Sequence, residues 1–173
     1  MSAVVAALRP GVDEVLQWLA AVPDPEIPVI SVVELGIVRD VAWHGECLLV
    51  TITPTYSGCP ATEAIRAAIE QALRDRGIKT LEIRTQLAPA WTTDWLSESA
   101  RDKLRAYGIA PPGPVPRAGR VLDIRALAEE PAPACPRCGS VRTRLVSRFG
   151  ATPCKSAHVC ADCLEPFERF KCH

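Results

Sequence analysis

Apolar and polar side chains follow helical and strand-like periods along the first two thirds of the chain. Segments 12–22, 59–77 and 95–107 place apolar side chains three to four positions apart, which predicts amphipathic helices. Shorter segments with alternating or continuous apolar character predict strands at 37–43, 48–53 and 81–85. The order of these elements predicts an α+β domain, in which a small mixed sheet is backed by helices (α-β-β-α-β-α).

The chain divides further by composition. We assign residues 1–110 to the α+β domain and residues 111–134 to a linker that begins with the stiff string PPGPVP. Residues 135–173 contain too few apolar side chains to bury a core unaided. We therefore expect this segment to be a small module that folds around a metal ion.

Two Cys-x-x-Cys pairs give this module its chemistry. The paired cysteines are Cys135, Cys138, Cys160 and Cys163. Four thiolates at this spacing can close a tetrahedral shell around Zn²⁺, and a closed shell predicts a structural zinc ribbon rather than a catalytic centre. An iron–sulfur centre is the alternative. Cys154 and Cys172 are either spare or core thiols, or else ligands of a second metal or redox site.

Cys59 lies far from these cysteines in the sequence. It precedes Pro60, and this pairing is typical of the first position of a helix, here 59–77. Unpaired backbone N–H groups and the helix dipole would favour its thiolate, although a buried structural cysteine is an equal alternative. No histidine is near in sequence, which favours a soft-metal ligand over the nucleophile of a thiol enzyme. Three carboxylates are candidate site residues, or alternatively ordinary cap and turn residues: Asp24, Glu26 and Glu34.

The charge balance excludes little and adds one expectation. The 173 residues carry 20 acidic and 20 basic side chains, which gives no argument for binding nucleic acid or a membrane surface. No run of about 18 apolar residues predicts a membrane span, and the N-terminal segment lacks a signal-peptide pattern, so we expect a cytoplasmic protein. Residues 1–110 are net negative and residues 111–173 net positive, which suggests mutual attraction or different partners. We interpret the basic side chains of the second module as contacts for an acidic protein, not for nucleic acid.

Several strings resemble known families. The strings DPEIPV (24–29) and VVELGIV (32–38), with Thr53-Pro54 and Cys59-Pro60, resemble the small iron–sulfur assembly domain of cytosolic cluster-targeting factors and bacterial SufT-like proteins. The strings similar to the D-subunit (PaaD) family of the bacterial phenylacetyl-CoA epoxidase system are TPTYSGCPATE (53–63), PAWTTDW (89–95) and EPFERFKC (165–172).

This resemblance implies an accessory role without an active site of its own. Members of the family are thought to help mature the epoxidase, by delivering an iron–sulfur cluster or iron. It implies that Cys59 handles the transient cluster, that Asp24 and Glu26 are the carboxylates beside it, and that Glu34 is a helper. Cys154 lies in a further family-like string, FGATPCK (149–155).

The resemblance also implies partners. These would be the other components of the phenylacetyl-CoA epoxidase complex, especially its iron–sulfur flavin reductase or its di-iron oxygenase. One thiolate cannot hold a cluster alone, so we expect a homodimer or a transfer complex. The alternative function is a non-catalytic structural subunit that docks components of the oxygenase.

Overall fold

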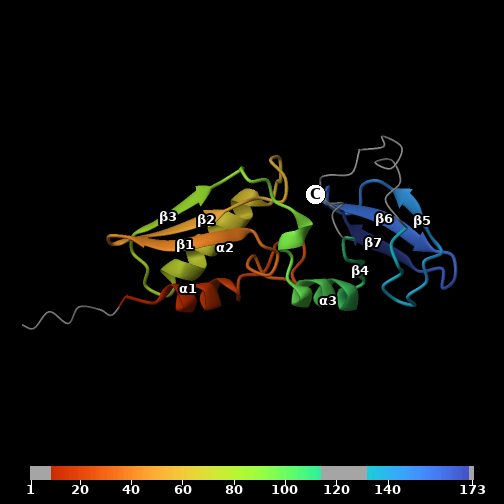
Figure 1. The fold of residues 1–173 in the computed structure, drawn as a ribbon, viewed down its shortest axis with the longest axis horizontal. Coiled ribbons are helices and arrows are strands. Elements are labelled where there is room, and N and C mark those ends of the chain that lie inside the picture. The colour runs from red at the N-terminus through yellow and green to blue at the C-terminus, as the bar shows by residue number, and fades with distance from the viewer. Residues whose placement is uncertain (1–8, 114–131, 172–173) are drawn as a thin grey trace, which may run out of the picture.

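The computed structural model describes residues 9–113 and 132–171, which fold as two lobes joined through one helix (Figure 1). The first lobe holds a three-stranded sheet with two helices, and the second holds a four-stranded sheet. This arrangement confirms the predicted α+β class, with a small cysteine-bearing module at the C-terminal end.

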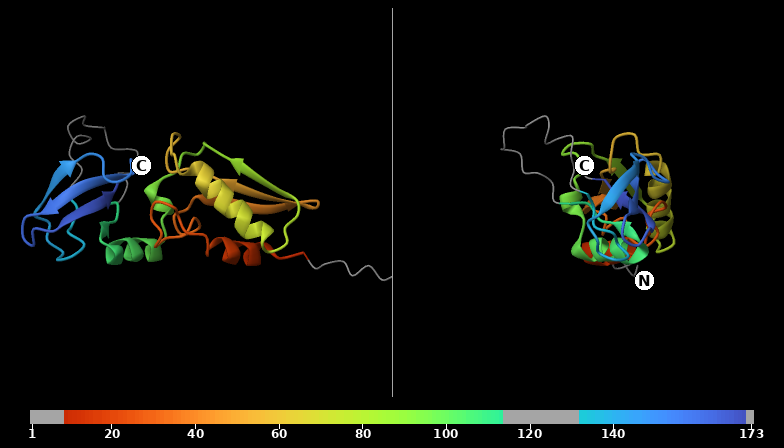
Figure 2. Two further views of the ribbon diagram at one scale, coloured as in Figure 1. Left: turned by 180° about the vertical axis from the view of Figure 1, so that it is seen from behind. Right: turned by 90° about the vertical axis from the view of Figure 1, so that its right-hand side faces the viewer.

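The first lobe is built around the strand order β1-β2-β3. Strands β1 (Val38–His44) and β2 (Cys47–Ile52) form an antiparallel hairpin. Helix α2 (Thr62–Arg74) then crosses over, so that β3 (Leu81–Thr85) pairs with β2 in parallel. Helix α2 covers one face of the sheet, and α1 (Val12–Leu19) lies beside β1 and α2 (Figures 1 and 2).

Apolar side chains from all of these elements form one core. The most deeply buried are Val15, Leu19, Leu48, Val50, Ile69 and Leu73. They occupy the positions that the helical and alternating patterns assigned to the inner faces. The pattern of the sequence therefore sets the interior of this lobe.

The second lobe is an antiparallel sheet of β5 (Thr143–Ser147), β6 (Lys155–Cys160) and β7 (Pro166–Phe170). Its fourth strand, β4 (Ile109–Ala110), comes from the end of the first segment and pairs in parallel with β7. Helix α3 (Glu98–Tyr107) leads directly into β4. The chain that leaves the first lobe therefore becomes a hydrogen-bonded strand of the second sheet.

Side chains of the second lobe also enter the core of the first. Cys154 and Phe170 are buried and belong to the first lobe's apolar cluster. The ring of Phe170 meets that of Trp91 edge-on, with centroids 5.9 Å apart. Trp91 is itself fixed by a hydrogen bond from Nε1 to the carbonyl oxygen of Leu35, at 3.0 Å. Trp91 thus lies between the two lobes.

All three helices differ from their predicted bounds. Helix α1 ends at Leu19, before the predicted end at 22. The helix predicted at 95–107 begins only at Glu98: Trp95 ends a short 3₁₀ turn, η1 (Thr93–Trp95), and Ser97 caps α3 by accepting a hydrogen bond from the Ala100 N–H. Helix α2 begins at Thr62 and not at Cys59, since the Cys59 carbonyl accepts hydrogen bonds from the N–H and hydroxyl of Thr62 in a preceding turn. The helix-start argument for a Cys59 thiolate does not apply to this geometry.

The sequence did not predict β4, whose two residues are too short for a periodic signal. By hydrogen bonding they belong to the second sheet, although they lie within the predicted domain 1–110. Most of the predicted linker 111–134 lies outside the described residues.

Gly36 allows the loop that follows α1 to pass against η1. Its φ is +73°, and a Cβ at this position would lie 2.8 Å from the Trp95 Cβ and 2.9 Å from the Trp95 carbonyl oxygen. Both the left-handed backbone and the close approach require glycine.

We predict that Gly36→Ala lowers the free energy of unfolding by about 3 kcal/mol, because backbone strain adds to a steric clash. Gly45→Ala is the matched control, since Gly45 also has a positive φ of 59°, but a Cβ placed there would meet no neighbouring atom within 4 Å. That control should lose about 1 kcal/mol. Urea unfolding of both variants measures the difference, and equal losses would refute the clash.

Candidate functional site

The four paired cysteines meet at one end of the second lobe. Cys135 and Cys138 lie in the loop before β5, Cys160 ends β6, and Cys163 lies in the following turn. Their sulfur atoms all lie within 4.8 Å of one another. The Sγ–Sγ distances are 3.7 Å for Cys135–Cys163 and 3.6 Å for Cys138–Cys160.

These distances fit a zinc ion. Four sulfur atoms placed tetrahedrally at about 2.3 Å from zinc are about 3.8 Å apart. The Asp162 N–H points to the Cys160 Sγ at 3.4 Å, and the Asp162 carboxylate contacts the Ser140 hydroxyl and the Arg142 guanidinium. The donor set is therefore closed and internally braced, as a structural site requires.

Cys59 lies where the lobes meet, half-buried beside a cavity of about 10 Å³. The first lobe contributes Asp24, Glu26 and Cys59 to its lining, and the second lobe contributes Cys154 and Phe170. The structure thus brings together three of the four residues proposed for cluster handling, and it adds a second thiol from the other lobe.

Asp24 shapes the loop that holds Glu26. Its Oδ1 accepts hydrogen bonds from the N–H groups of Glu26 and Ile27, at 2.9 and 2.8 Å. Burial raises the pKa of Asp24 above its usual range, although these two bonds oppose the rise. Asp24 is therefore a turn-forming residue and a wall of the cavity at the same time.

Glu26 faces Cys154. The Cys154 thiol donates to Glu26 Oε2 at 3.5 Å and lies 3.0 Å from the Thr152 hydroxyl. Burial raises the pKa of Cys154 to about 11, and the neighbouring Glu26 carboxylate adds to the rise. Cys154 is thus a protonated thiol at neutral pH.

Two further residues define the electrostatics of this region. Burial raises the pKa of Tyr56, and Coulombic interactions with Cys59, Glu26 and Cys154 raise it further. Lys155 is buried and pairs with Glu168 at 2.7 Å, and its ammonium group favours the charged form of nearby Asp24. The region is therefore rich in acidic and thiol groups, with one buried cation from the second lobe.

Glu34, expected to assist Cys59, is committed elsewhere. Its carboxylate accepts hydrogen bonds from the Ser31 N–H and the Ser99 hydroxyl and pairs with Lys103 at 2.8 Å. It does not line the Cys59 cavity. Burial alone would raise the pKa of Glu34, but the bonds from Lys103, Ser31 and Ser99 outweigh burial and lower it. This arrangement ties the loop after α1 to α3, which is a structural role.

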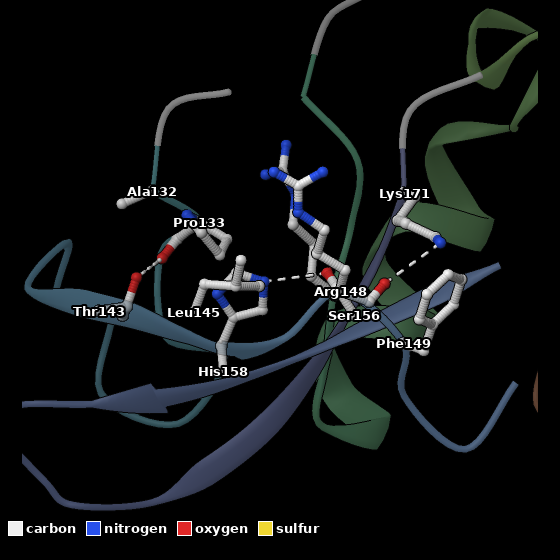
Figure 3. Close-up of a pocket in the computed structure, with 10 residues that line it drawn as sticks. Ala132, Pro133, Thr143, Leu145, Arg148, Phe149, Ser156, His158 and Lys171 are labelled. Carbon is white, nitrogen blue, oxygen red and sulfur yellow. Dashed lines mark hydrogen bonds between the residues drawn. The ribbon is translucent and has the colours of Figure 1, made fainter. Parts of the chain in front are cut away.

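A larger hollow of about 750 Å³ lies on the second lobe (Figure 3). Ser156 and His158 bond to each other at 3.0 Å across its floor, and the Lys171 ammonium donates to the Arg148 carbonyl oxygen. Lys171 also lies 4.7 Å from the ring centre of Phe149. Neither a thiol nor a carboxylate is among the described lining residues, so this hollow does not suit a metal ion.

Comparison with known proteins relates both lobes to families. Residues 12–80 match the family of iron–sulfur cluster assembly proteins, and residues 123–171 match the PaaD zinc beta ribbon domain. A protein of Escherichia coli K12, provisionally named as the D subunit of 1,2-phenylacetyl-CoA epoxidase, is 47% identical over 94% of each chain. The chain belongs to the PaaD family, the D subunits of phenylacetyl-CoA epoxidase.

Two further similarities cover the first lobe of this PaaD family member. An Fe-S protein maturation auxiliary factor of Porphyromonas gingivalis is 32% identical over 51% of this chain and 85% of its own. The crystal structure of a domain of unknown function from Bacillus anthracis is 28% identical, with a TM-score of 0.49, over 54% of this chain and 90% of that chain.

The two family matches divide the small cavity between them. Cys59, Asp24 and Glu26 lie in the assembly-protein match, and Cys154 lies in the zinc-ribbon match. Sequence reasoning paired Cys154 with Cys172, as spare or core thiols or as ligands of a second metal or redox site. The sequence feature that could have marked Cys154 as a site residue is its place in the family-like string 149–155. That string does not reveal that Cys154 lies beside the same cavity as Cys59, 95 residues earlier in the chain.

Three further expectations concern Cys172, Trp95 and the absence of a predicted membrane span. Cys172 lies outside the described residues. Trp95 is partly buried, with the Arg39 guanidinium 3.5 Å from the centre of its ring. Within the described ranges, no helix has both the length and the apolar character needed to cross a bilayer.

We predict that zinc removal unfolds the ribbon and releases its contacts with the first lobe, since the ribbon has little apolar core besides the metal. Amides of β6 and β7 should lose protection from hydrogen exchange, while those of β1 and β2 keep more of theirs. Cys138→Ser, which removes a zinc ligand, should lower the protection of the β6 and β7 amides as zinc removal does. Cys47→Ser should leave it unchanged. Protected β6 and β7 amides in verified zinc-free protein would contradict this.

We predict that Glu34→Gln lowers the free energy of unfolding by about 1 kcal/mol at pH 7, because a charge-assisted bond to Lys103 is lost. The pKa of Glu34 is lower in the folded protein than in the unfolded chain, where it is near 4.5. The stabilisation is therefore present at pH values above 4.5, and it is lost as the pH falls through the folded-state pKa. Urea unfolding at pH 7 and pH 4 should show the gap from wild type shrinking. Glu70→Gln, which removes an exposed pair with Arg74, should cost less than about 0.5 kcal/mol at both pH values.

Proposed function

We propose that this chain is an accessory maturation factor of phenylacetyl-CoA epoxidase, and that it handles iron or an iron–sulfur cluster at the Cys59 cavity. The observation that carries the proposal is the joint position of Cys59, Glu26 and Asp24 at one cavity between an assembly-type lobe and a zinc ribbon. The 47% identity to the Escherichia coli protein named as a D subunit supports the assignment of the whole chain to the phenylacetyl-CoA epoxidase system.

The donor chemistry supports metal handling over thiol catalysis. Sulfur and carboxylate donors suit iron, whereas a nucleophilic cysteine needs an adjacent base such as histidine. Among the described residues that line the cavity, none is a histidine.

The looseness of the site supports transient binding. The ribbon sulfurs converge to within 4.8 Å of one another, but the donors of the Cys59 cavity do not form such a group in the described part of the chain. A preformed shell holds its metal permanently, whereas donors that must be drawn together give up part of the binding free energy. A delivery protein needs this weaker grip.

The second candidate function is docking of epoxidase components without metal transfer. One observation favours it: β5 is the edge strand of the second sheet, and it exposes Leu145 and Val146, with Val141 just before it. An exposed apolar edge strand is suited to pairing with another chain.

We predict that Cys59→Ser abolishes maturation but not folding. The epoxidase subunits are co-expressed with wild-type chain, with Cys59→Ser or with no chain, and the iron content and activity of the purified epoxidase are measured. Cys59→Ser should reduce both at least about tenfold, because a ligand is lost at the transfer site. Cys47→Ser, which alters a thiol at the far end of β2, should match wild type.

Two results would contradict metal handling. One is normal iron content and activity with Cys59→Ser. The other is normal iron content in an epoxidase that is inactive without the chain and that retains the chain at fixed stoichiometry. The second result would favour the docking function.

A further inference from the structure

We propose that Cys154 of the ribbon and Cys59 of the assembly lobe are two thiolate ligands of one cargo site, completed by the Glu26 carboxylate, and that this site takes a single Fe²⁺ ion. The inference rests on the proposed function and deepens it. It assigns the second sulfur ligand to the same chain, not to a second copy.

The position of Cys154 is the first argument. It is buried with the first lobe's core and lines the same cavity as Cys59, although it follows β5 in the other lobe. Its hydrogen bond reaches across the lobes to Glu26 Oε2. Cys154 directly precedes β6, whereas the paired ribbon cysteines converge around Cys160 at the opposite end of that strand, so Cys154 is not part of the zinc shell.

The loop that carries Cys154 is braced, which is the second argument. The Lys171 N–H donates to the Cys154 carbonyl oxygen at 2.9 Å. Glu168 accepts a hydrogen bond from the Ala151 N–H and pairs with buried Lys155. At Gly150, a Cβ would clash with the Glu168 carboxylate. A spare thiol needs no such support, whereas a ligand must be held in position.

The size and donor set of the site indicate its cargo. A cavity of about 10 Å³ holds roughly one water-sized sphere, which is enough for one ion and too small for a multi-atom cluster in this arrangement. Two sulfur donors and one carboxylate suit a borderline-soft ion such as Fe²⁺ better than Mg²⁺ or Ca²⁺. Cys59 is half-buried, not fully enclosed, so its sulfur keeps some access to solvent for exchange.

On this proposal, the ribbon zinc also supports the cargo site. Zinc folds the ribbon, the folded ribbon inserts Phe170 and Cys154 between the lobes, and Cys154 completes the cargo site. A single chain supplies both sulfur ligands, so iron binding does not require a homodimer.

The test is an anaerobic titration of the zinc-loaded full-length chain with Fe²⁺, followed by iron X-ray absorption and size-exclusion chromatography. Wild type should bind one Fe²⁺ per chain with two sulfur neighbours and stay a monomer. Cys154→Ser and Cys154→Ala should each weaken binding at least about tenfold and leave one sulfur neighbour. Cys59→Ser should do the same, and Cys47→Ser should not. Retained zinc in each variant verifies that the ribbon is folded.

The outcomes separate the inference from the proposed function. If Cys59→Ser loses iron but both Cys154 variants bind like wild type, the inference is overturned and the proposed function stands. One sulfur neighbour in wild type, or two that appear only in a dimer, also overturns it. Wild-type chain that binds no Fe²⁺ overturns the inference and leaves the proposed function only in its iron–sulfur cluster form. Wild-type chain that binds Fe²⁺ equally well without Cys59 refutes the inference and the role of Cys59 in the proposed function.

Discussion

The insertion of Phe170 and Cys154 into the core of the first lobe is the contact on which the rest of the structure depends. It places an aromatic ring against Trp91 and a thiol against Glu26, and both belong to a module that has little apolar interior of its own. Strand β4 adds backbone hydrogen bonds to the same junction. Apolar burial and strand pairing together fix the lobes, so a site between them has defined walls.

The chain contains two sulfur-rich sites of opposite character. In the ribbon, four thiols converge on one point and their neighbours are locked by Asp162, which favours permanent retention of zinc. Between the lobes, thiols and carboxylates surround a small cavity without converging. The difference is one of preorganisation: the ribbon sulfurs already lie within 4.8 Å of one another, whereas the donors around the cavity form no such group in the described residues.

Charge reinforces the junction without creating it. The first 110 residues are net negative and the remainder net positive. At the interface this bias takes a specific form, because buried Lys155 of the second lobe pairs with Glu168 and lies close enough to Asp24 to favour its charged form. A buried ammonium without such partners would be costly.

The sequence by itself determined the helices and strands of the first lobe and the four-thiol ribbon, because periodicity and short ligand spacing are local properties. Contiguous motifs also indicated Cys59, Asp24 and Glu26 as one group of site residues. The sequence placed the start of α2 three residues too early, where a hydrogen-bond partner decides between plausible local conformations. The role of Glu34 stays a prediction, and the structure pairs its carboxylate with Lys103. Only the tertiary structure placed Cys154 beside Cys59 and β4 in the second sheet. Both are contacts between segments tens of residues apart, and such pairings are selected by core packing and strand register, which no local pattern encodes.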